Sequence, residues 1–346
     1  MKAVVLKEAG GPEKLIYEEV NTPAPEAGEV LVKLKYAALN RRDLFNTYGV
    51  PGVKLPAIPG SDGTGTIVEL GENVQDIEVG SNVIINPGMG WGVDDKKPDP
   101  NFYLFGLPKQ FHNKINKKIY VNGTFAQYMV VPAENIHPKP NYLTWEEAAV
   151  LSLAGVTAYR ALISKGQVQK GETVLIPGIG SGVALFLLQM CVALGANVYV
   201  TSGNEEKIER AKQLGAVGGV NYRSPDWSSE LREMMGSADL IVDGVAGEGF
   251  NILLDLVAEG GRIVTFGETN GSVSQFMLSK IFMKNLDVKG TKMGSPREFV
   301  KMLEFFETHH IRPIIDRCYQ LDQAAEALTY MQEGGNFGKI VLSIPG

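Results

Sequence analysis

A glycine-rich segment in the middle of the chain has the residue types and spacing of a phosphate-binding loop. Residues 173–184 read Thr-Val-Leu-Ile-Pro-Gly-Ile-Gly-Ser-Gly-Val-Ala, an apolar strand pattern that runs directly into glycines. Glycine lets the backbone approach a pyrophosphate, and the following helix offers free N–H groups and the positive end of its dipole. The spacing departs from G-x-G-x-x-G, because Ala184 stands where one register expects the last glycine. The predicted pyrophosphate contacts are Gly178, Gly180, Ser181, Gly182 and Val183.

The end of the next strand bears on which dinucleotide binds. An acidic residue about 20 positions after the glycines holds the ribose 2′-hydroxyl of NAD, but residues 201–204 are Thr-Ser-Gly-Asn and the first carboxylate is Glu205. Neutral Ser202 and Asn204 leave room for a 2′-phosphate that Lys207 would neutralise. Such a charge-assisted contact contributes about 1.5–3 kcal/mol, hence roughly a ten- to hundredfold preference for NADPH. Lys207 as a solvated helix residue, with NAD as cofactor, is the alternative.

The glycine loop opens a series of strands that alternate with helices. Six strands spaced by helices indicate an α/β fold with a doubly wound parallel sheet of the Rossmann type. Glycines between a strand and a helix can serve the geometry of the turn alone. At the start of such a series, however, they favour a dinucleotide-binding site. The strand at 286–289 would form an edge of this sheet. The expected strands are 173–176, 197–201, 219–222, 239–243, 262–266 and 286–289, and the expected helices are 182–194, 204–214, 227–235 and 249–257.

The two ends of the chain have a different pattern. Short β-like runs separated by glycine and proline fill the first 130 or so residues and predict an antiparallel barrel or sandwich. A polar, turn-rich stretch at 87–124 interrupts them. Thr144 begins a capping box with Glu147 and starts the helical part of the chain. Helices at 299–307 and 322–332 and a strand at 339–344 close the chain.

Composition narrows the class of protein. The chain has 346 residues, a net charge of −6, 40 glycines and two cysteines. A protein with a net negative charge does not attract the phosphate backbone of a nucleic acid, so we expect no nucleic-acid partner. Two cysteines cannot form a disulfide framework or a four-cysteine zinc site. The N-terminal residues lack the apolar stretch of a signal peptide, and the segment 183–194 is too short to span a bilayer, so we expect a cytoplasmic protein without membrane contact.

Several short segments in a fixed order resemble the medium-chain dehydrogenase/reductase superfamily, in particular its zinc-free quinone oxidoreductases. The resemblance implies a GroES-like domain (residues 1–142 and 292–346) around a Rossmann domain (143–291), with the active site in the cleft between them. The matching segments are 39–43 (Leu-Asn-Arg-Arg-Asp), 58–65 (Ile-Pro-Gly-Ser-Asp-Gly-Thr-Gly), 79–83 (Val-Gly-Ser-Asn-Val), 146–149 (Glu-Glu-Ala-Ala), 153–159 (Leu-Ala-Gly-Val-Thr-Ala-Tyr), the glycine loop, 221–223 (Asn-Tyr-Arg) and 338–342 (Gly-Lys-Ile-Val-Leu).

The positions that hold zinc in relatives carry other residues here. Zinc-dependent alcohol dehydrogenases of the superfamily have cysteine at the position of Asn40, histidine and glutamate at those of Ser61 and Asp62, and a further ligand near Leu153 or Ala154. Neutral asparagine and serine do not replace a thiolate and an imidazole. The stretch 87–124, where relatives carry a structural zinc, has no cysteine. We therefore expect no metal, with a zinc-type alcohol dehydrogenase as the alternative. His112, His137, His309 and His310 lie outside any ligand spacing.

The missing zinc ligands limit the chemistry. Without a Lewis acid to stabilise an alkoxide, hydride transfer to an acceptor activated by conjugation is the easier reaction. We therefore expect reduction of a quinone or an α,β-unsaturated carbonyl compound, with hydrogen bonds stabilising the enolate. By resemblance, Asn40 and Asp43 line the cleft. Tyr48 is the nearest tyrosine for proton donation, although a packed or surface role for it is favoured. Relatives often have an aromatic hydroxyl closer to Asp43, where this chain has Phe45, so the resemblance assigns no proton donor.

The resemblance also assigns the remaining contacts. Thr157 would face the nicotinamide, and Tyr222 the adenine ribose. Loop residues that would close over the nicotinamide are Phe266, Gly267, Phe337 and Lys339, with a plain core role as the alternative for the two phenylalanines. The family implies a homodimer through the 286–289 edge. A non-catalytic NADPH-binding redox sensor is the alternative of another class.

Overall fold

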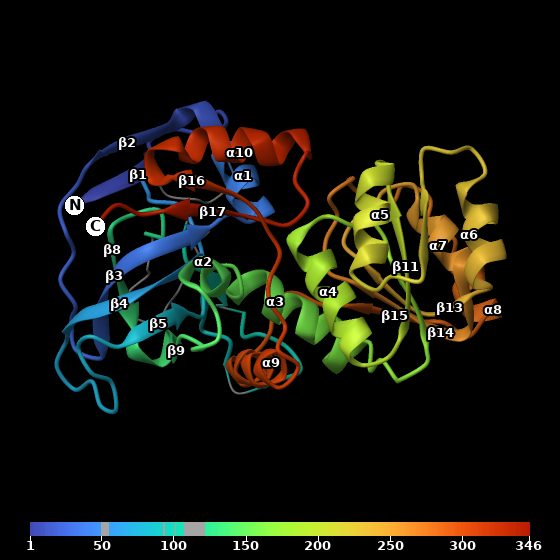
Figure 1. Cartoon of the computed structure of the whole chain (residues 1–346), viewed down its shortest axis with the longest axis horizontal. Coiled ribbons are helices and arrows are strands. Elements are labelled where there is room, and N and C mark those ends of the chain that lie inside the picture. The colour runs from blue at the N-terminus through green and yellow to red at the C-terminus, as the bar shows by residue number, and fades with distance from the viewer. Residues whose placement is uncertain (50–54, 93, 101, 107–121) are drawn as a thin grey trace. The chain divides into compact units, whose positions relative to one another are not determined.

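The chain forms two compact units, each described here by itself. The computed structural model describes residues 1–49, 55–92, 94–100, 102–106 and 122–346. One unit comprises residues 1–154 with 295–346, and the other comprises residues 155–294 (Figure 1). Both divisions fall further along the chain than the sequence-based boundaries after residues 142 and 291. His112 lies outside the described residues.

The unit of residues 155–294 is built on a six-stranded parallel sheet. Its strand order is β12-β11-β10-β13-β14-β15, so the chain builds outward from β10 in one direction and then in the other. This confirms the expected doubly wound sheet, with β15 at an edge. The strands are β10 (Thr173–Ile176), β11 (Asn197–Ser202), β12 (Gly218–Asn221), β13 (Ala238–Asp243), β14 (Val257–Thr265) and β15 (Asp287–Gly290).

Helices connect these strands and bury the sheet. Because such crossovers are right-handed, the helices between β10, β11 and β12 cover one face and those that join β13, β14 and β15 cover the other. Helix α4 is apolar on nearly all sides and is buried accordingly. The helices are α3 (Ser152–Tyr159) with a π-helical continuation (Arg160–Lys165), α4 (Gly182–Ala193), α5 (Glu205–Gln213), α6 (Trp227–Met235), α7 (Phe250–Leu256) and α8 (Leu278–Met283). The sequence pattern did not predict α8.

The other unit joins the two ends of the chain in one sheet. Its order is β16-β17-β3-β4-β5-β9, and β8 also pairs with β3. The C-terminal strand β17 runs antiparallel to β3, with Val341 opposite Ala38. Apolar side chains of these strands form one core cluster with the helix α10. The strands are β3 (Glu29–Ala38), β4 (Asp62–Leu70), β5 (Asn82–Ile85), β8 (Tyr128–Pro132), β9 (Ile136–Pro138), β16 (Ile315–Gln320) and β17 (Lys339–Ser343).

Short hairpins and four helices complete this unit. The helix α2 begins after Thr144, whose hydroxyl accepts a hydrogen bond from the Glu147 N–H at 3.2 Å, which confirms the predicted capping box. The sequence pattern missed α1, which follows β3 directly. The hairpins are β1 (Lys2–Leu6) with β2 (Leu15–Glu19) and β6 (Gly88–Met89) with β7 (Tyr103–Leu104); the helices are α1 (Arg41–Thr47), α2 (Trp145–Ala149), α9 (Pro296–Thr308) and α10 (Ala324–Glu333).

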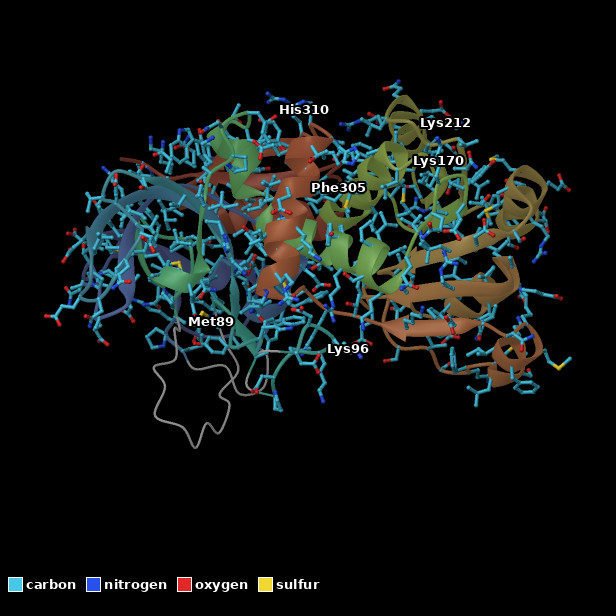
Figure 2. All side chains as sticks on the ribbon, turned by 90° about the horizontal axis from the view of Figure 1, so that it is seen from below. Met89, Lys96, Lys170, Lys212, Phe305 and His310 are labelled. Carbon is cyan, nitrogen blue, oxygen red and sulfur yellow. The ribbon has the colours of Figure 1, made fainter. Side chains whose placement is uncertain are left out.

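Helix α5 has a polar outer face. Among its side chains is Lys212, labelled in Figure 2, whose ammonium pairs with Glu209 at 2.7 Å. Within the described residues, no helix combines the length and the apolar character needed to cross a bilayer.

Candidate active site and cofactor site

The turn between β3 and α1 buries two polar side chains that the sequence singled out. Asn40 is the N-cap of α1, and its backbone N–H donates to Asp43 Oδ2 at 2.8 Å. Asn40 and Asp43 are both buried. An asparagine followed three residues later by a carboxylate therefore begins the helix and holds both side chains inside the unit.

The side chain of Asn40 has hydrogen-bond partners on both of its polar atoms. Its Nδ2 donates to Ser61 Oγ at 3.2 Å, and its Oδ1 accepts from Lys339 Nζ at 2.7 Å. Lysine has only donors, so the atom that faces it must be the amide oxygen. The orientation of the amide follows from this chemistry.

Lys339 lies at the start of β17 with its ammonium inside the unit. Its Nζ donates to the carbonyl oxygen of Leu39 at 2.7 Å and lies 3.4 Å from Asp62 Oδ2. The other oxygen of Asp62 accepts from the Leu153 N–H at 2.9 Å. Burial lowers the pKa of Lys339 and raises the pKa of Asp62, and the opposite charge of each partner opposes the shift of the other. The result is a buried cation held by three oxygens.

This set of side chains does not fit a zinc ion. Asn40 and Ser61 offer neutral oxygens, and the one carboxylate, Asp62, faces the ammonium of Lys339. Structural and catalytic zinc sites use thiolate, imidazole and carboxylate ligands. Among the residues that the structure describes, no group of three or more histidine, cysteine, aspartate and glutamate side chains is placed to hold a metal.

Asp43 has a second environment, different from that of Asp62. Its Oδ1 has no hydrogen-bond partner among the described residues, and the nearest cation is Arg42 Nη1 at 3.7 Å. Burial raises the pKa of Asp43 to about 6, although the charge of Arg42 lowers it. Arg42 donates to the carbonyl oxygens of Phe105 at 2.9 Å and Gly106 at 3.1 Å. The sequence analysis gave no role to Arg42, although the motif at 39–43 contains it.

Tyr48 does not join this cluster. It is the C-cap of α1, half of it is exposed, and its hydroxyl donates to Gln332 Oε1 at 2.9 Å. Its role as proton donor stays a prediction. Phe337 is buried and its N–H donates to Asp316 Oδ1 at 3.0 Å, so its backbone is fixed within this unit.

The glycine loop of the other unit has the geometry of a pyrophosphate cradle. Gly178 and Gly180 have φ angles of +67° and +115°, which favour glycine. Ser181 caps α4, and its Oγ accepts from the Ala184 N–H at 3.3 Å. A Cβ on Gly178 would lie 2.7 Å from Val245 Cγ2, just after β13. The loop thus lies where the strand order reverses and directly precedes α4, whose positive N-terminal end favours an anion. These residues fit a dinucleotide.

The end of β11 brings together further predicted residues. Ser202 is buried, and its Oγ accepts from the Asn204 N–H at 3.2 Å. Asn204 caps α5 and accepts from the Lys207 N–H at 3.4 Å. A Cβ on Gly203 would lie 2.8 Å from Tyr222 Oη and 2.9 Å from Arg223 Nε. Tyr222 and Arg223 therefore cover Gly203. The sequence analysis missed Arg223, although it belongs to the 221–223 motif.

The other cofactor residues lie near the carboxyl ends of β13 and β14 or on α3. The N–H of Phe266 donates to the Asp243 carbonyl at 3.0 Å, and a Cβ on Gly267 would lie 3.1 Å from the Gly244 carbonyl oxygen. These loops lie at the same end of the sheet as the glycine loop. Thr157 is buried on α3. The contacts of all these residues with a cofactor stay predictions.

The fold and the two sites define an oxidoreductase class with a dinucleotide-binding sheet and a separate unit that carries a buried polar cluster. Comparison with known protein families supports this class. Residues 26–141 match the alcohol dehydrogenase GroES-like domain, and residues 182–308 match the zinc-binding dehydrogenase domain. The chain belongs to the medium-chain dehydrogenase/reductase superfamily.

Relatives match along nearly the whole chain. A zinc-type alcohol dehydrogenase-like protein of Leptosphaeria maculans is 36% identical over 94% of this chain and 93% of its own length. An acryloyl-coenzyme A reductase of Sulfurisphaera tokodaii is 28% identical over 99% of both chains. A crystal structure of an NAD-dependent alcohol dehydrogenase superposes with a TM-score of 0.92, with 34% identity and full coverage of both chains.

Replacing Asp43 by asparagine tests the electrostatics of the cluster. The folded protein holds a proton on Asp43 up to about pH 6, whereas the unfolded chain loses it near 3.8. Wild-type stability therefore falls as pH rises through this window, by about 3 kcal/mol. The stability of Asp43→Asn relative to wild type should rise by that amount between pH 4 and 7, as measured by urea unfolding.

His137→Gln is the matched control with the opposite sign. Burial lowers the pKa of His137 from 6.5 to about 4. Wild-type stability therefore rises with pH between these values, and the variant should lose stability relative to wild type over the same range. If the free energies of unfolding of Asp43→Asn and of the wild type change in parallel from pH 4 to 7, the raised pKa of Asp43 is wrong.

Proposed function

We propose that this chain is a cytoplasmic, NADPH-dependent oxidoreductase that transfers hydride to a quinone or an α,β-unsaturated carbonyl compound without zinc. The observation that carries the proposal is the donor set at positions 40, 61 and 62. An amide, a hydroxyl and a carboxylate that faces an ammonium stand where zinc-dependent relatives have their ligands. The hydride acceptor must then be electrophilic without help from a metal. A carbonyl group conjugated to a double bond makes the acceptor electrophilic in this way.

The residues of the cluster have definable tasks in this reaction. The nicotinamide, when bound, supplies the hydride. Asn40 Nδ2 is a hydrogen-bond donor for the oxygen on which negative charge develops, and its buried position strengthens that bond. The proton that completes the reduction comes from solvent or from a side chain. The relative named acryloyl-coenzyme A reductase supports this choice, because its named substrate is an α,β-unsaturated thioester.

A zinc-type alcohol dehydrogenase is the second candidate function. The names of several relatives favour it, among them that of the protein of Leptosphaeria maculans. The side chains at positions 40 and 61 oppose it, since neither supplies the thiolate or imidazole that zinc prefers.

An acceptor screen separates the two functions. We expect purified protein with NADPH to reduce quinones, enals or enones, and to leave saturated ketones and alcohols unchanged. Because no metal takes part, EDTA should not alter the rate. Alcohol oxidation that scales with stoichiometric zinc supports the second candidate. Tight NADPH binding without turnover of any acceptor indicates the non-catalytic sensor.

The choice of NADPH over NADH rests on the end of β11. The strand ends without a carboxylate, and Arg223 and Tyr222 lie over Gly203. Lys207 lies in the first turn of α5, directly after the Asn204 cap. Two cations beside a neutral strand end favour a 2′-phosphate. Glu205, at the start of α5, opposes it but is exposed to solvent.

Removing either cation should weaken NADPH binding selectively. Lys207→Ala and Arg223→Ala should each raise the Kd for NADPH by roughly ten- to a hundredfold, and leave the Kd for NADH unchanged, in fluorescence titrations. Lys212→Ala is the matched control, because Lys212 also lies on α5 but in its last turn, away from the end of β11. Equal affinity of the wild type for both nucleotides would refute the preference.

We also propose a homodimer formed through β15. This strand is an edge of the parallel sheet, so its outer N–H and C=O groups are free to pair with a second copy. Helix α8, just before it in sequence, exposes Leu278, Phe282 and Met283 by 64%, 66% and 71%. Val288 on β15 is also exposed. An apolar surface beside an open edge is typical of a subunit interface.

A charge on this surface should dissociate the dimer. Phe282→Glu should give a monomeric mass by light scattering at micromolar concentration, while the wild type gives twice that mass. Val217→Glu is the control, because Val217 is also exposed but precedes β12, at the opposite edge of the sheet. A monomeric wild type contradicts the dimer.

A further inference from the structure

We propose that Arg42 is a positioning residue, which fixes the loop of residues 58–62 that carries Ser61 of the buried polar cluster. It acts through the backbone of residues 105–106, which belong to the turn-rich stretch before the gap in the described residues. The effect on turnover rests on the proposed function, whereas the effect on the loop does not.

The loop of residues 58–62 is held by its own backbone rather than by its side chains. The carbonyl oxygens of residues 58, 59 and 60 each accept a hydrogen bond from an N–H group of residues 123–125, at 2.8, 3.0 and 3.1 Å. The carbonyl oxygen of Asp62 accepts from Thr124 Oγ1 at 2.8 Å. The place of the loop therefore depends on where the residues of the turn-rich stretch lie.

Two glycines of this stretch lie directly against Gly60. Gly106 has a φ angle of +66°, and a Cβ on it would overlap the Gly60 carbonyl oxygen and lie 2.8 Å from the Gly60 nitrogen. A Cβ on Gly123 would overlap the same carbonyl oxygen. Glycine alone permits such a close approach of backbones. Gly60 directly precedes Ser61, so a shift of either glycine is transmitted to the cluster.

Arg42 connects Gly106 to helix α1. Its Nη1 donates to the Phe105 carbonyl oxygen at 2.9 Å, and its Nη2 donates to the Gly106 carbonyl oxygen at 3.1 Å. The side chain of Arg42 is only 23% exposed. A planar guanidinium binds two neighbouring oxygens in a fixed geometry, which the ammonium of lysine does not reproduce. Because the donors are charged, these bonds are stronger than neutral ones.

The loop matters to the cluster because it supplies partners for the amide of Asn40. Asn40 Nδ2 donates to Ser61 Oγ at 3.2 Å, and the side chain of Asp62 also hydrogen-bonds to Asn40. In the proposed function Asn40 contacts the acceptor. A displaced loop would move both partners of the amide together, and small displacements of such groups are costly in rate.

Hydrogen exchange tests the effect on the loop without any turnover. In Arg42→Met we expect the amides of residues 123–125 to exchange roughly ten- to a hundredfold faster, which is the factor that loss of a charge-assisted hydrogen bond gives to a local opening. The amides of β10, in the other unit, should exchange as in the wild type. Unchanged exchange at residues 123–125, or an equal acceleration in β10, overturns the inference.

Two further variants make this measurement specific. Gly106→Ala places a Cβ against the Gly60 backbone and leaves Arg42 intact, so the amides of residues 123–125 should again exchange faster. Arg312→Met is the matched control, because Arg312 also holds a backbone carbonyl oxygen of the same unit, that of Tyr142 at 2.7 Å. It should leave the amides of residues 123–125 unchanged.

Turnover tests the consequence for the reaction. In Arg42→Met we expect kcat with a conjugated acceptor to fall by roughly ten- to a hundredfold, with the Kd for NADPH unchanged, and in Arg42→Lys to fall less. Guanidinium chloride at millimolar concentration should restore part of the rate of Arg42→Met, because the free ion can bind the same two carbonyl oxygens. Potassium chloride at equal concentration should not.

The two measurements fail in different ways. An unchanged kcat beside faster exchange, or a loss of rate that guanidinium does not restore, overturns the positioning role of Arg42. A wild type that reduces no conjugated acceptor overturns the proposed function, and the exchange of residues 123–125 then decides the inference alone.

Discussion

A buried lysine needs oxygens, and this requirement joins distant parts of the chain. Lys339 and Asn40 are 299 residues apart, yet their side chains meet at 2.7 Å because β17 pairs with β3. Moving an ammonium out of water costs several kcal/mol unless its donors are satisfied. The turn before α1 and the start of β4 supply the acceptors, and Asp62 is in turn held by the Leu153 N–H. The pairing of β17 with β3 therefore brings a buried charge from one end of the chain to its acceptors near the other end.

The two buried aspartates show how environment separates identical groups. Asp62 has a cation and a backbone N–H as partners. Asp43 has one hydrogen-bonded oxygen and one without a hydrogen-bond partner among the described residues, and its pKa rises to about 6. Asp43 therefore loses its proton at a higher pH than an ordinary carboxyl group. A carboxyl group of this kind is typical of functional sites, where burial is tolerated for its chemical effect.

The parallel sheet could be predicted from local sequence patterns, whereas the partners of the buried side chains could not. The glycine loop and the strand period depend on neighbouring residues, so the doubly wound parallel sheet and the position of the glycine loop were predicted. The partners of Lys339 depend on a contact between chain ends, which no local pattern reveals. Tyr48 illustrates the same limit: it lies close to Asp43 in sequence, but α1 carries its hydroxyl to Gln332. Arg223 was visible only as part of a motif.

The strength of the available hydrogen bond decides which acceptors suit this cluster. Zinc lowers the pKa of bound water by many units, to about 7, a change that holds an oxyanion at neutral pH. A hydrogen bond to a charged group contributes about 1.5–3 kcal/mol, which corresponds to only about one or two pKa units. In the proposed reaction, a hydrogen bond of this strength would suit an anion whose charge is already delocalised far better than an alkoxide. A quinol or an enolate is such an anion, because conjugation spreads its charge over carbon and oxygen before the protein contributes anything.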